Sequence, residues 1–172
     1  PARDYRRHDV KPYRTSSSLS ARMARALVNL VAPPAQTILD PFCGTGSILL
    51  EAAALGLHAF GRDHNLKMAG MSRRNLAYFG YSVRVELGSA QDSTQAADAV
   101  VTDLPYGRQL EQDQVALRQV LHHTIQLAPQ AVYLAQEDIT PWLVDAGYAR
   151  VACYRVRKHR SMSRFVHHAW HA

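Results

Sequence analysis

The sequence has very little cysteine and no long hydrophobic run. Only two of its 172 residues are cysteine, Cys43 and Cys153, and they match no metal-ligand spacing. Two isolated thiols are typical of a reducing compartment, so we expect a cytoplasmic protein. No window reaches the roughly 18 consecutive apolar residues that a membrane-spanning helix needs. The polar and basic first residues do not form a signal peptide, and we expect no association with a membrane.

Two common nucleotide-binding motifs are also missing. After Gly44 and Gly46, the sequence has Leu49 where the third glycine of a GxGxxG fingerprint would stand. It contains no GxxxxGK[ST] either, so NAD and P-loop binding of ATP are both disfavoured. The histidine doublets at 122–123 and 167–168 have no cysteine or carboxylate partner at ligand spacing, and we therefore expect no metal site.

The chain carries a moderate excess of positive charge. It has 20 Lys and Arg against 14 Asp and Glu, a formal net charge of +6. This excess favours a polyanionic partner such as RNA or DNA, although two solvated basic termini would give the same balance. The basic residues gather near both ends of the chain: Arg3, Arg6, Arg7, Lys11 and Arg14, then Arg155, Arg157, Lys158, Arg160 and Arg164.

Hydrophobic periodicity predicts alternating strands and helices. Residues 1–19 have little periodicity and are expected to form an N-terminal arm, followed by one domain at residues 20–172. Helices are expected at 20–31 (capped by Ser20), 47–56, 64–80, 111–128 and 139–147. Strands are expected at 37–42, 57–63, 82–87, 97–103 and 131–136, with two more at 148–156 and 164–170 around a basic turn at 157–163.

This alternation requires parallel strands covered by helices on both faces. The last two strands are joined by a short turn and must pair antiparallel. We therefore predict an α/β fold with a doubly wound, Rossmann-like sheet of seven strands that includes an antiparallel C-terminal strand pair.

Three of the expected strands have an aspartate at or near their carboxyl ends: Asp40, which runs on into Pro41 and Phe42, then Asp63 and Asp103. Ligands of open α/β sheets bind at the carboxyl ends of the strands, where these side chains lie. The glycine loop that follows Asp40 lets the backbone approach a ligand, and the helix that opens at Ser47 favours a carboxylate. Asp63 is placed to bind ribose hydroxyls. A glycine pair alone marks only a tight turn, but the combination predicts a nucleoside with a zwitterionic end, which S-adenosylmethionine (SAM) fits.

Two stretches, "ILDPFCGTGSILLEAA" and "VVTDLPYGR", resemble the THUMP-associated RNA guanosine-N2 methyltransferases. The upstream segment "SLSARMARALVNLV" is also similar to that family, and the resemblance covers about residues 10–136. It implies a class I SAM-dependent methyltransferase that acts on tRNA or rRNA. Family members carry an RNA-binding THUMP domain before the catalytic domain. Because this sequence begins at Pro1 without one, we expect an excised catalytic domain or a small protein that relies on its basic arm and tail.

The resemblance also implies a set of cofactor-binding residues. Tyr13 and residues 15–18 resemble a segment that lies over the cofactor, unless this terminus is floppy. Where the family has an acidic residue that holds the adenine, this chain has Ser89, so either Asp92 or a backbone N–H near Ala90 or Gln91 takes that role. The full expected set is Asp40, Phe42, Cys43, Gly44, Thr45, Gly46, Asp63, His64, Ala90, Asp92 and Asp103.

The "DLPYG" stretch is suited to gripping a base amine. An exocyclic amine is a poor nucleophile, because its lone pair is delocalised into the ring. The Asp103 carboxylate and the Leu104 carbonyl can accept its two hydrogens and localise that lone pair, while Pro105 fixes the turn. Tyr106 can stack on the base for roughly 1–3 kcal/mol, and Arg108 can contact a phosphate. Alternatively, Asp103 caps a turn, Tyr106 packs in the core and Arg108 is an ordinary surface residue.

The basic turn offers a second surface for RNA. Arg157, Lys158 and Arg160 are expected either to contact RNA or to form a plain solvated hairpin. The leading functional interpretation is N2-methylation of a guanosine in tRNA or rRNA. N6-methylation of adenine in DNA and N5-methylation of glutamine in a protein use a related Asx-Pro-Pro-aromatic clamp. A non-catalytic RNA-binding relative is the third possibility.

Overall fold

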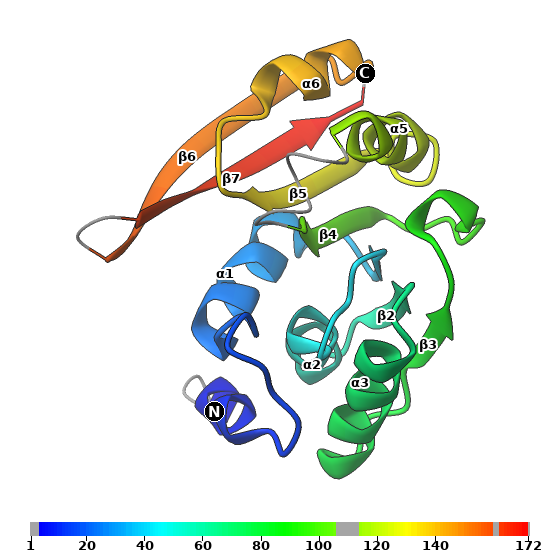
Figure 1. The fold of residues 1–172 in the computed structure, drawn as a ribbon, viewed down its shortest axis with the longest axis vertical. Helices are drawn as coiled ribbons and strands as arrows, with labels where there is room; N and C mark the ends of the chain where they lie inside the picture. The colour runs from blue at the N-terminus through cyan, green and yellow to red at the C-terminus, as the bar shows by residue number, and fades with distance from the viewer. Residues whose placement is uncertain (1–3, 106–113, 160–161, 172) are drawn as a thin grey trace.

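The computed structural model describes residues 4–105, 114–159 and 162–171 (Figure 1). Their helices are η1 (Asp4–Val10), α1 (Ala21–Val31), α2 (Ser47–Ala54), α3 (Leu66–Tyr78), η2 (Ala90–Asp92), α5 (Gln114–Thr124) and α6 (Thr140–Asp145). Their strands are β1 (Thr37–Asp40), β2 (His58–Asp63), β3 (Arg84–Leu87), β4 (Ala99–Asp103), β5 (Gln130–Ala135), β6 (Arg150–His159) and β7 (Met162–Trp170). The predicted order of elements is confirmed, with helix ends trimmed by a few residues.

The strands form one seven-stranded sheet in the order β3-β2-β1-β4-β5-β7-β6. Strands β1 to β5 are parallel to one another, and β7 runs antiparallel to both β5 and β6. This confirms the predicted α/β sheet with an antiparallel C-terminal strand pair. The first strand, β1, lies inside the sheet, with β2 on one side and β4 on the other, so the strand order changes direction between β1 and β4. That is the position where open α/β sheets bind ligands.

One boundary differs from the sequence prediction. The basic segment 157–163 was expected to be a turn, but most of it is strand. The ladder between β6 and β7 continues through Arg157↔Ser163 to His159↔Met162. The physical reason is that cross-strand pairing satisfies the backbone N–H and C=O groups of this segment, whatever the charge of its side chains. The hairpin therefore extends beyond the body of the sheet (Figure 1).

Each face of the sheet carries its own hydrophobic core, because the parallel strands are buried on both sides. In β4, Val101 packs with the cluster formed around α1, α2 and α3, whereas Val100 packs with the cluster around α5 and α6. In β5, Val132 packs with the first of these clusters and Tyr133 with the second. Helices therefore lie on both faces (Figure 1), and the strand ends are fixed from both sides.

The ends of the helices follow local sequence signals. The Ser20 hydroxyl accepts a hydrogen bond from the amide of Met23 and caps α1, as expected. Asn65 caps α3 by accepting bonds from the amides of Lys67 and Met68. In the part of the chain that the structure describes, no helix has both the length and the apolar character needed to cross a lipid bilayer.

Candidate active site

A cavity of about 250 Å³ lies at the carboxyl edge of the central strands. Asp40, Asp63 and Asp103, which end β1, β2 and β4, all line it. The three strand-end carboxylates therefore face one space, as the sequence predicted. The lining is completed by Thr15, Ser17, Ser18, Leu19, Phe42, Cys43, Gly44, Thr45, Ser47, Ile48, His64, Leu104 and Pro105.

Asp63 organises the glycine loop as well as facing the cavity. Its Oδ2 accepts a hydrogen bond from the Gly44 amide at 2.9 Å, and its Oδ1 accepts one from the Asn65 amide at 2.9 Å. The loop itself turns sharply at Gly46, where φ is +83°. This positive φ selects for glycine, and a Cβ added at Gly46 would also lie 2.5 Å from the Ser72 hydroxyl, which would have to move. The loop delivers the chain directly into the start of α2.

Asp40 is the most deeply buried of the three carboxyl groups, at 1% exposure. Its Oδ1 accepts hydrogen bonds from the Thr102 hydroxyl at 2.6 Å and from the Phe42 amide at 3.2 Å. Burial raises the pKa of Asp40 to about 7; the hydrogen bonds oppose this shift, and the nearby charges of Asp103 and Asp63 add to it. This carboxyl group therefore changes its charge near neutral pH. Thr102 gave no distinguishing signal in the sequence, because threonine is common in strands.

Asp103 is held from two directions. The backbone that follows it is fixed to β5, because the Leu104 amide donates to the Leu134 carbonyl at 3.0 Å. Its carboxylate Oδ1 accepts a hydrogen bond from the guanidinium of Arg164 in β7. The sequence placed Arg164 only within a basic cluster and missed this role, since 61 residues separate the pair. Tyr106 and Arg108, which were predicted to stack on the base and to contact a phosphate, lie outside the described residues.

The predicted arm borders the cavity. Thr15, Ser17, Ser18 and Leu19 contribute to the lining. The Ser18 hydroxyl lies 3.0 Å from the Thr45 hydroxyl, and the Ser47 hydroxyl donates to the Leu19 carbonyl at 2.8 Å. The arm is thus hydrogen-bonded to the glycine loop and to the start of α2.

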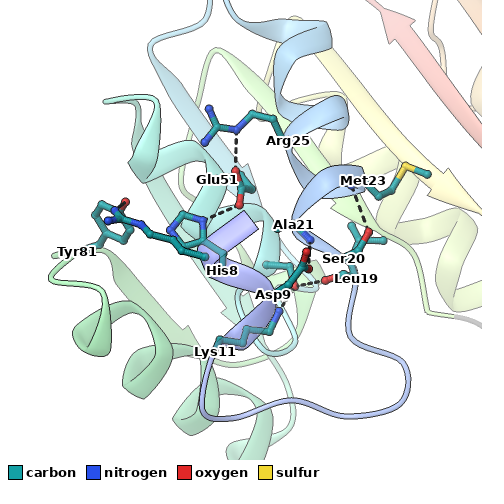
Figure 2. A network of polar contacts seen from close by, with 12 residues as sticks. His8, Asp9, Lys11, Leu19, Ser20, Ala21, Met23, Arg25, Glu51 and Tyr81 are labelled. Atoms are coloured by element: carbon teal, nitrogen blue, oxygen red, sulfur yellow. Dashed lines mark hydrogen bonds and ion pairs between the residues drawn. The ribbon is translucent and has the colours of Figure 1, made fainter. Parts of the chain in front are cut away.

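A buried polar network anchors the start of the arm (Figure 2). Glu51 of α2 is fully buried, and its two oxygens lie 2.6 Å from His8 Nδ1 and 2.7 Å from Arg25 Nε. The Lys11 ammonium donates to the Ser47 hydroxyl, and burial lowers the pKa of Lys11 to about 8. The network joins η1 to α1 and α2. Sequence reasoning did not find it, because its members show no periodic pattern.

Two residues expected near the adenine lie away from this cavity. Ala90 is buried in η2 and Asp92 is exposed there, and neither belongs to the cavity lining among the described residues. Ser89 caps η2 by accepting a hydrogen bond from the Gln91 amide at 3.3 Å. Contact of Ala90 or Asp92 with an adenine therefore stays a prediction.

The basic hairpin is partly described. Arg155 and Arg157 are exposed on β6, and Arg155 Nε donates to the Ser163 hydroxyl at 3.1 Å. The structure gives the backbone of Lys158, whereas Arg160 lies outside the described residues. Strand β6 is the edge of the sheet, so these arginine side chains are accessible to a large partner.

One group of potential metal ligands occurs on the α6 side of the sheet: Asp138, Cys153 and His167. Asp138 Oδ1 accepts bonds from the amide and hydroxyl of Thr140, and these bonds lower the pKa of Asp138 to about 2. The Ile139 amide donates to His167 Nε2 at 3.1 Å. These contacts hold the start of α6, and we propose no metal there.

Comparison with known proteins places the chain in a family. Residues 7–138 match the UPF0020 family model, which is described as an RMKL-like methyltransferase domain. The tRNA (guanine(10)-N2)-dimethyltransferase of Methanothermobacter thermautotrophicus is 33% identical over 174 residues, covering 91% of this chain and 50% of that protein. The chain therefore spans about half the length of such curated relatives.

Two solved structures share the fold. TrmN from Thermus thermophilus superimposes with a TM-score of 0.78 at 24% identity, covering 98% of this chain and 53% of that one. Magnesium protoporphyrin IX methyltransferase (ChlM) from Synechocystis PCC 6803 was solved with bound SAM. It superimposes with a TM-score of 0.70 at 17% identity, covering 87% of this chain and 76% of that one. These findings confirm the predicted resemblance and the class I methyltransferase fold. The chain belongs to the UPF0020 family of RMKL-like methyltransferase domains.

Proposed function

We propose that this chain is a catalytic domain that methylates the N2 amine of a guanosine in RNA, with tRNA as the favoured substrate and SAM as the methyl donor. The observation that carries the proposal is the convergence of Asp40, Asp63 and Asp103 on one cavity beside the glycine loop. Its relative from M. thermautotrophicus is named a tRNA guanine-N2 dimethyltransferase, which supports the choice of base and atom.

The donor groups of the cavity fit SAM. The Asp63 carboxylate suits the ribose hydroxyls, and the glycine loop with the free N–H groups at the start of α2 suits the aminoacyl carboxylate. The buried Asp40 carboxyl suits the cationic amino group. Once bound, SAM supplies an electrophilic methyl group on its sulfonium. Arm residues Ser17 and Ser18 border the same space and help to exclude water from it.

The acceptors for the base amine come from the end of β4. The Asp103 carboxylate and the Leu104 backbone carbonyl accept the two hydrogens of the amine, which localises the nitrogen lone pair. Catalysis then rests mainly on positioning for in-line attack, and the negative charge of Asp103 stabilises the positive charge that develops on nitrogen. The methylated nitrogen finally loses one proton and returns to its neutral form.

The RNA is held by charge and presents an extruded or single-stranded base. The net charge of +6 and the exposed Arg155 and Arg157 support a polyanionic partner. A cytoplasmic location agrees with this substrate, and both cysteines are free thiols, as is usual in a reducing compartment. Because the chain spans about half of its relatives, further RNA-binding surface outside these 172 residues is part of the proposal.

The test is to incubate the purified protein with isotope-labelled SAM and unmodified tRNA, and then to analyse the nucleosides by mass spectrometry. Label in N2-methylguanosine or N2,N2-dimethylguanosine supports the proposal. Parallel incubations with DNA and with a cell-protein fraction test the related amine methylations: label in N6-methyladenine of DNA or in protein glutamine, without label in RNA guanosine, contradicts the proposal. Failure to bind SAM in calorimetry would instead favour a non-catalytic RNA-binding role. Asp103→Ala serves as the inactive variant, and Glu137→Gln, at an exposed position, as the matched control.

A further inference from the structure

Arg164 reaches across the end of a strand to hold the carboxylate of Asp103. Its side chain starts on β7, and β5 lies between β7 and β4 in the sheet. Arg164 Nε donates to the Ala135 carbonyl at the end of β5 at 3.3 Å, and Nη2 donates to Asp103 Oδ1. One guanidinium thus bridges the last residue of β5 and the last residue of β4.

The pair is protected from solvent. Arg164 is 4% exposed, and the Asp103 side chain is 16% exposed. A guanidinium this well buried has lost most of its hydration, and breaking such a buried ion pair is costly. The contact therefore constrains both side chains much more strongly than a surface ion pair would.

Asp40 and Asp103 line the same cavity but differ in their surroundings. Burial raises the pKa of Asp40 to about 7, and this carboxyl group accepts hydrogen bonds from two neutral groups, the Thr102 hydroxyl and the Phe42 amide. Asp103 instead lies against a cation. The two carboxyl groups are thereby suited to different tasks, one able to change its charge near neutral pH and the other favoured as a fixed negative charge.

We propose that Arg164 is a positioning residue for methyl transfer. It keeps Asp103 ionised and fixes the plane of the carboxylate, so that an acceptor points at the amine before the base arrives. This inference rests on the proposed function, since it assigns Arg164 a part in the same amine clamp. Because the ion pair also weakens Asp103 as a base, Asp103 acts as a hydrogen-bond acceptor and leaves removal of the proton to solvent.

The activity test uses Arg164→Gln, Arg164→Lys, Asp103→Asn and the double variant Arg164→Gln/Asp103→Asn. Misplacement of a catalytic group costs up to about 100-fold, so Arg164→Gln is expected to lower kcat by about 10- to 100-fold. Its Kd for SAM should stay close to that of the wild type, and Arg164→Lys should recover much of the loss. In the Asp103→Asn background, Arg164→Gln should lower kcat little further, because Arg164 acts by holding the carboxylate that this background already lacks. Equal losses in both backgrounds would overturn the proposal.

A second measurement separates this inference from the proposed function. The carboxyl carbon of Asp103 is followed by NMR against pH in the wild type, in Arg164→Gln and in Arg164→Lys, with Asp103→Asn used to assign the signal. The titration should move to higher pH in Arg164→Gln and stay near the wild type in Arg164→Lys. If the wild type methylates no RNA guanosine, the proposed function fails. The titration would still show whether Arg164 stabilises the ionised carboxylate of Asp103. An unchanged titration in Arg164→Gln overturns the inference even if the wild type is fully active.

Discussion

The side chain of Asn75 clamps the backbone of Tyr13 on both sides. Its Oδ1 accepts a hydrogen bond from the Tyr13 amide at 3.0 Å, and its Nδ2 donates to the Tyr13 carbonyl at 2.7 Å. The same Nδ2 donates to the Thr45 carbonyl at 2.8 Å. One fully buried amide on α3 therefore fixes the arm and the glycine loop relative to each other. This relationship makes the arm part of the cavity wall.

Asn75→Ala should therefore damage both stability and cofactor binding. It removes the hydrogen bonds to the half-buried backbone of Tyr13 and to the buried Thr45 carbonyl, for an expected loss of about 2–4 kcal/mol in the free energy of unfolding. Urea denaturation measures this loss, and calorimetry should show weaker SAM binding. Lys67→Ala, an exposed change on the same helix, is the control and should stay within about 0.5 kcal/mol of the wild type. A loss below about 1 kcal/mol for Asn75→Ala would contradict the clamp.

Asp63→Ala and Asp103→Ala should have opposite effects. Loss of Asp63 removes the proposed ribose acceptor and frees the Gly44 amide, so the Kd for SAM should rise by about 10- to 100-fold. Asp103→Ala should abolish methyl transfer while leaving SAM affinity nearly unchanged. Calorimetry with SAM and a single-turnover transfer assay measure the two effects. Equal loss of SAM binding in both variants would contradict the separate roles.

Asp40 should make stability depend on pH. Its pKa is about 7 in the folded chain against 3.8 for an ordinary aspartate, so between these values the folded state binds a proton that the unfolded state has released. The contribution of Asp40 to stability therefore falls as pH rises from about 4 to about 7 and is constant outside that window. Asp40→Asn removes this contribution. The difference in unfolding free energy between wild type and Asp40→Asn, measured in urea across this range, should decrease with pH. A flat difference would contradict the shift.

Glu51→Ala should destabilise the protein strongly. Glu51 is fully buried and pairs with Arg25 and His8 beneath the arm, as Figure 2 shows, so its removal breaks both contacts inside the protein and leaves a cavity there. We expect a loss of about 3–5 kcal/mol in the free energy of unfolding, measured by urea denaturation. Glu137→Ala, at an exposed position, should change stability by less than about 0.5 kcal/mol. Similar losses in the two variants would show that the network contributes little.

Replacing Arg155 and Arg157 by alanine should weaken RNA binding without altering SAM binding. Binding to RNA weakens as salt rises, and the slope of the logarithm of the binding constant against the logarithm of the salt concentration measures this effect. Each lost phosphate contact should reduce the size of this slope by about one, whatever the RNA sequence. Filter binding or fluorescence anisotropy at several salt concentrations measures this slope. Arg84→Ala on β3, at the opposite edge of the sheet, is the matched control and should leave the slope unchanged. An unchanged slope in the double variant would place the RNA elsewhere.

Much of the site follows from short-range patterns. Strands that end in Asp40, Asp63 and Asp103 were visible in the sequence, because an apolar run followed by a carboxylate is a local feature. Parallel pairing then brings such ends to one edge whatever the details of packing. The glycine loop was predictable for the same reason, since positive φ angles at tight turns select for glycine.

Local patterns alone also led to an error. The segment 157–163 was predicted to be a turn from its basic composition, yet cross-strand pairing made most of it strand. Likewise, the histidine doublet at 167–168 showed no partner at ligand spacing, but antiparallel register places Cys153 opposite His167. Pairing partners in a sheet depend on register between distant segments, which sequence spacing does not report.

Short-range residue patterns were enough to predict the order of strands and helices, the glycine loop and the carboxylates at the strand ends, because each depends on residues within a few positions of one another. The partners of those groups became visible only in the folded chain. The pairings of Asp103 with Arg164, Asp40 with Thr102, and Asn75 with both Tyr13 and Thr45 each join residues at least 30 positions apart. Such contacts depend on how the strands are ordered and how the helices pack, and these are properties of the whole chain.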